Sequence, residues 1–352
     1  WGLVVATIAA WSAALVVRLV YLRRFARLRV PRADLREGAG ALPGYLRFGL
    51  RAGGGSFANT LSDTAPVWIL APLAPVAVVG AWSRVELLTA RLTEGLVRVA
   101  EMLFPTLVER REDGDTEGYE RVLIDTVRYV VGGTLLVAAS LGGARFGVMD
   151  VFGPGFDVAA GTLAVIMLAG PLHAISIVQQ LTLYSVDRPL ATTVAAVVRM
   201  ILVVVLGIAL VLMLGVVGIA LAVVIALAIS AIVQGHELRR ELSGSFMRFW
   251  PARALAAAVL AYGGGFAVAW FVDHNADGHL ATLLALVAGS FTYLALYLVA
   301  GGTLPRDRER VGKGLERLRR MRSGGPPENG APGANTPRGV GAADGRRARL
   351  PT

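Results

Sequence analysis

Apolar residues of this chain fall into nine long stretches, which short polar segments separate. Each stretch holds roughly 20 residues, which as a helix is long enough to cross the hydrocarbon core of a bilayer. We therefore predict nine membrane-spanning helices, at residues 1–20, 48–71, 78–104, 124–144, 158–184, 190–213, 215–235, 253–272 and 280–301. This pattern is typical of an all-α polytopic membrane protein.

Composition agrees with this fold class and limits the chemistry. Of 352 residues 55% are hydrophobic and 17% are charged, and the mean hydropathy is +0.60, well above that of an ordinary soluble domain. The sequence contains no cysteine, which excludes disulfides, thiol nucleophiles and thiolate metal sites, and its four histidines lack zinc-like spacing. Since no catalytic motif stands out either, we expect neither a cofactor nor enzymatic activity.

The net charge of +10 does not indicate nucleic-acid binding. Residues 301–352 contain 12 Lys and Arg against 5 Asp and Glu, so this segment alone carries +7 of the +10. A basic segment of this kind suits the anionic inner leaflet of a membrane.

The arginines that lie between predicted spans are concentrated in alternate connections. The connections at 72–77, 149–157, 214 and 273–279 contain no Lys or Arg, and Arg145, at the outer end of the fourth span, is the one basic residue near that side. Each of the other connections contains at least one Arg. Because basic loops stay on the cytoplasmic side, we predict a multi-pass protein of the cytoplasmic membrane with its C-terminus inside.

The predicted span 78–104 carries charge along one helical face, at Arg84, Arg91, Glu94, Arg98 and Glu101. Ionised side chains that face lipid are costly, so this face must meet protein, an opposite charge or a watery cavity. Two interpretations stay open: a structural ladder of ion pairs one turn apart, or guanidinium groups presented to an anionic substrate. Glu86 lies on the opposite face and is expected at the membrane interface.

Other polar residues lie within predicted spans two, five and six. Asn59 and Asp63 share one stripe, and Pro66 is expected to kink their helix. Asp63 either serves transport, as intramembrane carboxylates usually do, or pairs with an arginine of the third span. Arg199 lies too deep to reach the interface and is expected to face a cavity, whereas His173 is interpreted as a packing residue.

Several short motifs fall where the predicted helices begin, turn and end. They are Gly49, Asp63, Val79-Gly80 with an aromatic residue two positions on, Leu103-Phe104-Pro105, Phe152-Gly153 with Phe156 and Ala159, and the run 215–222. Together they resemble polysaccharide (O-antigen-type) flippases of the multidrug/oligosaccharidyl-lipid/polysaccharide exporter superfamily, over about residues 1–300. Trp82 departs from this pattern, because a tyrosine is common at its position.

The resemblance implies two six-helix lobes around a central cavity, followed by two extra helices. On this plan residues 1–22 end the first lobe, 23–47 form a cytoplasmic linker, and 48–235 form the C-terminal lobe. Residues 236–302 then supply a cytoplasmic loop and two extra helices, and 303–352 a basic, largely disordered cytoplasmic tail. Because the chain starts at Trp1 within an apolar run, we expect a C-terminal fragment with five spans missing upstream.

The resemblance also implies a function. It implies a transporter that flips a polyprenyl-pyrophosphate-linked oligosaccharide across the cytoplasmic membrane for cell-surface polysaccharide biosynthesis. Expected partners are a glycan linked to an undecaprenyl-pyrophosphate-type lipid, membrane lipids and polysaccharide assembly proteins. The residues expected to bind substrate are Arg84, Arg91, Arg98, Arg199 and Asn59, and those expected to couple transport to an ion or proton are Asp63 and Glu94.

Two alternatives stay open. A cation-coupled drug or metabolite antiporter of the same superfamily would need acidic residues to dominate the cavity, whereas arginines are expected to dominate it here. A membrane scaffold that transports nothing would be recognised by the absence of substrate transport in proteoliposomes.

Overall fold

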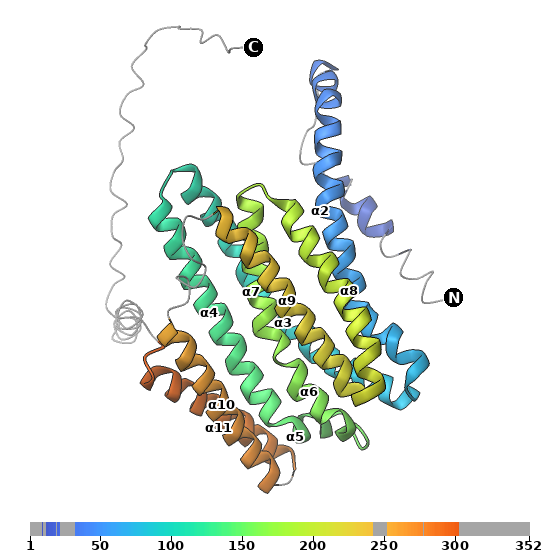
Figure 1. The fold of residues 1–352 in the computed structure, drawn as a ribbon, viewed down its shortest axis with the longest axis vertical. Coiled ribbons are helices and arrows are strands. Elements are labelled where there is room, and N and C mark those ends of the chain that lie inside the picture. The colour runs from blue at the N-terminus through green and yellow to red at the C-terminus, as the bar shows by residue number, and fades with distance from the viewer. Residues whose placement is uncertain are drawn as a thin grey trace.

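The computed structural model describes residues 9, 12–18, 20–21, 32–241, 252–276 and 278–302, and every regular element in these ranges is a helix (Figure 1). The elements are α2 (Arg32–Leu73), α3 (Val76–Glu112), α4 (Thr116–Gly143), α5 (Arg145–Asp150), η1 (Asp157–Ala159), α6 (Ala160–Ile166), α7 (Ala169–Ser185), α8 (Pro189–Leu214), α9 (Val216–Glu241), α10 (Ala252–Asn275) and α11 (His279–Val299). The predicted all-α fold is confirmed. Most of the first span and the whole tail lie outside the described residues.

Six helical segments within the described part of the chain are long and apolar enough to cross a membrane. They are Thr116–Gly143, Asp157–Ser185, Pro189–Leu214, Val216–Arg240, Arg253–Asn275 and His279–Val299. These match the last six predicted spans, so the chain is a polytopic membrane protein. The predicted spans 48–71 and 78–104 form α2 and α3, which are longer helices with more polar and charged residues.

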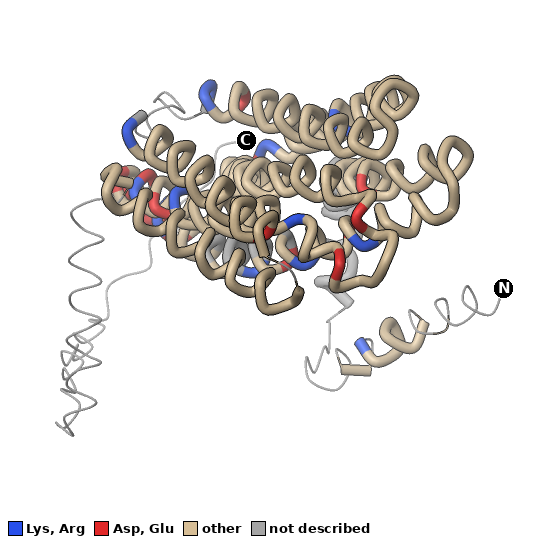
Figure 2. Tube along the Cα trace, turned by 90° about the horizontal axis from the view of Figure 1, so that it is seen from below, with Lys and Arg blue, Asp and Glu red and all other residues tan. Residues whose placement is uncertain are grey.

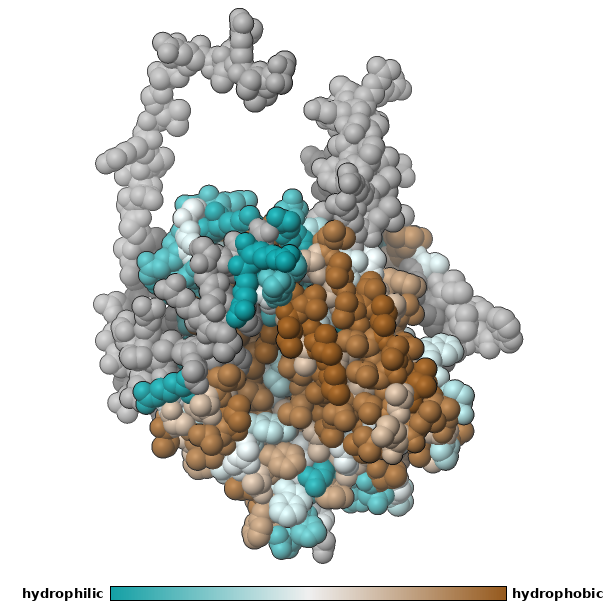
Figure 3. All heavy atoms as spheres, viewed as in Figure 1, coloured by the Kyte–Doolittle hydropathy of each residue, from teal (hydrophilic) through white to brown (hydrophobic). Residues whose placement is uncertain are grey.

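The connections sort to two ends of the bundle. In Figure 1 the turns after α3 and α7 and the end of α9 lie towards the upper end, and the turns after α2, α8 and α10 lie towards the lower end. The upper set carries Arg110, Arg111, Arg188, Arg239 and Arg240. Most positions along the helices are uncharged (Figure 2), and on the face that Figure 3 shows, apolar side chains form a band between the two ends. We call the upper end the arginine-bearing end; its cytoplasmic location stays a prediction.

Helices pack side by side in the order α2, α8, α9, α7 and α4, with α3 against α7 and α4. Many core residues are small, such as Ala138, Ala160 and Ala226 beside Leu163 and Val203. Small side chains let helix backbones approach closely, which is how helices associate in lipid. α2 packs mainly on α8 and only slightly on α3, its neighbour in sequence, so a space remains between α2 and α3.

The predicted span 158–184 is a broken helix and not a continuous one. Pro171 has no N–H to donate to the carbonyl of Met167, and its ring crowds that carbonyl. The chain therefore turns at Met167 and Leu168, between α6 and α7. By contrast α2 continues as one helix through Pro66.

The hairpin of α10 and α11 is fixed to α4 by hydrogen bonds. The Tyr293 hydroxyl donates to the Gly132 carbonyl at 2.9 Å, and the hydroxyls of Ser140 and Ser290 are 2.8 Å apart. The Asp273 carboxylate accepts hydrogen bonds from backbone N–H groups in the first turn of α5. The hairpin thus packs on the rest of the bundle, and the domain division at residue 235 stays a prediction.

We expect an Ala276→Cys variant, but not a Glu112→Cys variant, to react with a membrane-impermeant maleimide applied to intact cells. Ala276 follows α10 in a turn that is free of Lys and Arg, whereas Glu112 follows Arg110 and Arg111, and basic connections stay inside. Fluorescence of the purified protein reports a single site, because the chain has no other cysteine. Both variants should react after permeabilisation. Reaction of Glu112→Cys alone in intact cells would show that the orientation is the opposite of the predicted one.

Candidate substrate cavity

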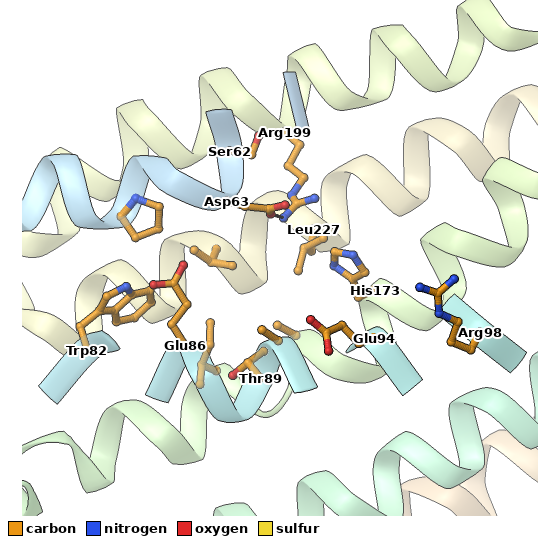
Figure 4. Close-up of a pocket in the computed structure, with 15 residues that line it drawn as sticks. Ser62, Asp63, Trp82, Glu86, Thr89, Glu94, Arg98, His173, Arg199 and Leu227 are labelled. Atoms are coloured by element: carbon orange, nitrogen blue, oxygen red, sulfur yellow. Dashed lines mark hydrogen bonds and ion pairs between the residues drawn. The ribbon is translucent and has the colours of Figure 1, made fainter. Parts of the chain in front are cut away.

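A cavity of about 370 Å³ lies between α2, α3, α7, α8 and α9. Its polar lining consists of Ser62, Asp63, Trp82, Glu86, Thr89, Glu94, Arg98, His173 and Arg199. Figure 4 shows Asp63 and Arg199 on one side of the cavity, Glu86 and Glu94 across from them on α3, and His173 beside the arginine. The rest of the wall is apolar and includes Pro66, Ile166 and Val223.

The side chains that α3 contributes follow a line that is oblique to the helix axis. They recur mostly every four residues, at Trp82, Glu86, Ala90, Glu94 and Arg98. A row of residues four apart is inclined to the helix axis, and packed helices meet along such rows. The face predicted from Arg84 to Glu101 runs parallel to the axis instead, so only its later part reaches the cavity.

Arg199 is the most deeply buried charge of the site, with 8% of its side chain exposed against 54% for its partner Asp63. Its Nη2 donates to Oδ1 of Asp63 at 2.5 Å, and its Nη1 lies 3.5 Å from Oδ1 of Asn59, at the outer limit of hydrogen bonding. The pair joins α8 to α2 and leaves the carboxylate facing the cavity. The suggested partner of Asp63 in the third span is therefore wrong, because the arginine comes from α8.

Arg84 and Arg91 are not among the described residues that line the cavity. The Cζ of Arg84 lies 5.9 Å from the ring centroid of Phe152, a cation–π distance. Arg91 donates to Glu94 at 2.8 Å, and both side chains are largely exposed. The ion-pair interpretation thus fits Arg91 and Glu94, while Arg84 packs against the turn that follows α5.

Carboxylates outnumber guanidinium groups in the lining: Asp63, Glu86 and Glu94 face Arg98 and Arg199. The expectation that arginines dominate the cavity is therefore wrong. Glu86 was expected at the interface, but the oblique line of α3 brings it into the cavity. Two of the three carboxylates have an arginine partner, since Asp63 pairs with Arg199 and Glu94 with Arg91.

The sequence interpretation missed two kinds of lining residue. His173 was interpreted as a packing residue, yet it lies beside Arg199 in the cavity wall. Trp82 and Thr89 were not assigned to a site. The four-residue spacing from Trp82 to Arg98 was visible in the sequence, but only knowledge of how α3 crosses its neighbours would have favoured that spacing.

The site combines guanidinium donors, carboxylates and an imidazole in a partly apolar space. Guanidinium groups bind phosphate through parallel hydrogen bonds, and carboxylates can take up a proton or a cation. Across the described residues, no three His, Asp or Glu side chains are grouped in a way that could hold a metal ion.

No family model matches the sequence, and no curated protein matches it. Among solved structures, the lipid II flippase MurJ in an inward closed conformation is similar, with a TM-score of 0.58, 14% identity, and coverage of 74% of this chain and 55% of that chain. The chain has a MurJ-like fold. It spans about half the length of that flippase, and at this identity the likeness concerns the fold alone.

We expect Asp63→Ala to destabilise the protein more than Arg199→Met does. Removing Asp63 leaves a buried guanidinium without its counter-charge, a change that costs about 3–5 kcal/mol. Removing Arg199 leaves a carboxylate that is half exposed and can be hydrated. Thermal unfolding in detergent should show the lowest midpoint for Asp63→Ala, with partial recovery in the double variant. A double variant less stable than both single variants would show that the two side chains do not act as a pair.

Proposed function

We propose that this protein flips a polyprenyl-pyrophosphate-linked oligosaccharide from the inner to the outer leaflet of the cytoplasmic membrane, for cell-surface polysaccharide biosynthesis. The observation that carries the proposal is the buried Arg199 at the wall of a polar cavity, within a bundle of flippase-like fold. A pyrophosphate head group needs fixed cations in a hydrated cavity, whereas its polyprenyl tail can stay in the bilayer.

We assign the head group to Arg199 and Arg98, from α8 and α3. Both line the cavity, and the planar fork of arginine matches the geometry of phosphate oxygens. Asn59 supports the guanidinium of Arg199 from the other side. Arg91 lies near the cavity through its partner Glu94, where it can meet the glycan, and Arg84 receives no ligand because it packs on Phe152.

Coupling of transport to a proton or cation follows from competition between Asp63 and the substrate for Arg199. In the structure Asp63 occupies one edge of the guanidinium. A pyrophosphate that arrives in the cavity competes for the same donors, and a displaced Asp63 is left as an uncompensated carboxylate in the membrane interior. Uptake of a proton or cation by Asp63 removes that cost. Glu94 acts towards Arg91 as Asp63 does towards Arg199. Rocking of the bundle against a second lobe would then carry the loaded site across the membrane.

A second candidate is a cation-coupled drug or metabolite antiporter, which the three carboxylates of the lining favour. The two functions differ in the charge of the substrate. Purified protein in proteoliposomes, given either a fluorescent lipid-linked oligosaccharide or a cationic dye, distinguishes them. Transport of neither would favour a membrane scaffold.

We expect Arg98→Gln to lower the rate of lipid-linked oligosaccharide flipping about 10- to 100-fold, because a hydrogen bond to a charged group contributes about 1.5–3 kcal/mol. Arg98→Lys should retain part of the activity, because its charge survives but its fork does not. Arg121→Gln is the matched control, since Arg121 pairs with Glu117 on α4 outside the cavity. If Arg98→Gln flips the substrate at the wild-type rate at equal protein levels, Arg98 does not bind the head group.

A further inference from the structure

Polar side chains form a row along one face of α7. His173, Ser176, Gln180 and Tyr184 recur at intervals of three and four residues, the spacing that places side chains on one face of a helix. Nε2 of Gln180 donates to the hydroxyl of Tyr184 at 2.8 Å. The row begins at the substrate cavity of about 370 Å³, which we call the large cavity. It ends one residue before α7 ends, at the arginine-bearing end of the bundle (Figure 1).

A second, smaller cavity of about 90 Å³ lies against the first three residues of this row, from His173 to Gln180. The three other helices around it also present polar side chains, which are Asn59 of α2, Thr192 of α8, and Ser230 and Gln234 of α9. Asp63, His173 and Arg199 line both this cavity and the large one, so the two spaces meet at the ion pair.

Buried polar atoms around the small cavity have no hydrogen-bond partner among the described residues. They are Oγ of Ser176, Oε1 of Gln234 and Nε of Arg199. A buried polar atom without a partner costs about 1–3 kcal/mol, and in native proteins ordered water commonly satisfies such atoms. A cavity needs roughly 10–15 Å³ to hold one water molecule, so the small cavity, at about 90 Å³, has room for several.

We propose that the small polar cavity is a water-filled path that opens towards the arginine-bearing end and lets protons from that side reach Asp63. The path itself rests on the geometry of the four helices. Its part in coupling rests on the proposed function, in which a pyrophosphate displaces Asp63 from Arg199. A hydronium ion of the water chain then gives its proton to the Asp63 carboxylate and becomes water. After the bundle has rocked and Arg199 is free to pair again, the carboxylic acid gives its proton to water on the other side of the membrane, so the proton crosses with the substrate.

Charged groups from three helices face Asp63 and set when it can hold a proton. Arg199 of α8 opposes protonation as long as the pair is intact, and Glu86 and Glu94 of α3 favour it. Arg98 and His173 also line the cavity, and both oppose protonation when charged. α9 contributes only the neutral groups Val223, Leu227, Ser230 and Gln234 to the two cavities. Protonation of Asp63 is therefore tied to loss of Arg199 as its partner.

Silver ions test the path, since they are small, move through water and bind thiolates in a chain that has no native cysteine. The test variant is Ser176→Cys, in the small cavity. The matched control is Ser140→Cys, a buried serine of α4 that contacts Ser290. Vesicles of either orientation receive silver nitrate, and a fluorescent maleimide added after denaturation measures the thiols that remain.

We expect silver to block Ser176→Cys at least tenfold faster than Ser140→Cys, from the same face on which Glu112→Cys reacts. Adding Ser230→Leu, which fills the small cavity, should slow that blocking at least tenfold. Equal rates for the two cysteine variants would show that the cavity is dry. Faster blocking from the opposite face, or no effect of Ser230→Leu, would show that water arrives through the large cavity. Each of these three contrary results would overturn the proposal of a water-filled path.

The proton role has its own readout. Ser230→Leu should bind the lipid-linked substrate as the wild type does but lose most of the acceleration that an imposed proton gradient gives to flipping. An unchanged response to the gradient would overturn the proton role. Failure of the wild-type protein to flip the substrate would overturn the proposed function instead, and the silver measurement would still decide whether the path exists.

Discussion

The structure depends on one constraint: a guanidinium buried in a membrane bundle must keep an anionic partner. Arg199 is 8% exposed, and Asp63 supplies the counter-charge at 2.5 Å from another helix. Two unit charges about 4 Å apart attract by about 4 kcal/mol at an effective dielectric constant of about 20, whereas an unpaired charge in the membrane interior is costly. The pair therefore holds α2 on α8, and it sets the position of the carboxylate that faces the cavity.

In the proposed function, the same constraint supplies a mechanism for coupling transport to a proton or cation. Arg199 can give up Asp63 only for another anion, and a pyrophosphate offers more charge and more oxygens than a single carboxylate. Asp63, once displaced, must be neutralised where it stands. The two cavities meet at this pair; one has room for a head group, and the other is lined, apart from the pair and His173, by neutral side chains that are mostly polar. In the proposed function, loading of the substrate and protonation of Asp63 are thus two consequences of one exchange of partners.

The sequence predicted the features that depend on local pattern, and it failed where helices cross. Apolar length alone located α4 and the helices from α8 to α11, and Arg199 was placed at a cavity because it lies too deep to reach an interface. The pairing of Asp63 with Arg199 could not be predicted, because the two residues are 136 positions apart in the chain and lie on different helices. Glu86 was misplaced because a helical wheel assumes a contact line parallel to the axis, whereas α3 meets its neighbours obliquely. The break at Met167 follows from Pro171, a local signal that was overlooked within a long apolar run.

Calorimetric binding of a short-chain isoprenoid pyrophosphate to the purified protein tests the exchange of partners most directly. If Asp63 competes with the pyrophosphate for Arg199, Asp63→Asn should bind the ligand at least tenfold more tightly than the wild type, because the competing charge is gone while the side chain keeps its size. Arg199→Gln should bind at least tenfold more weakly. Binding by Asp63→Asn that equals or falls below that of the wild type would contradict the account.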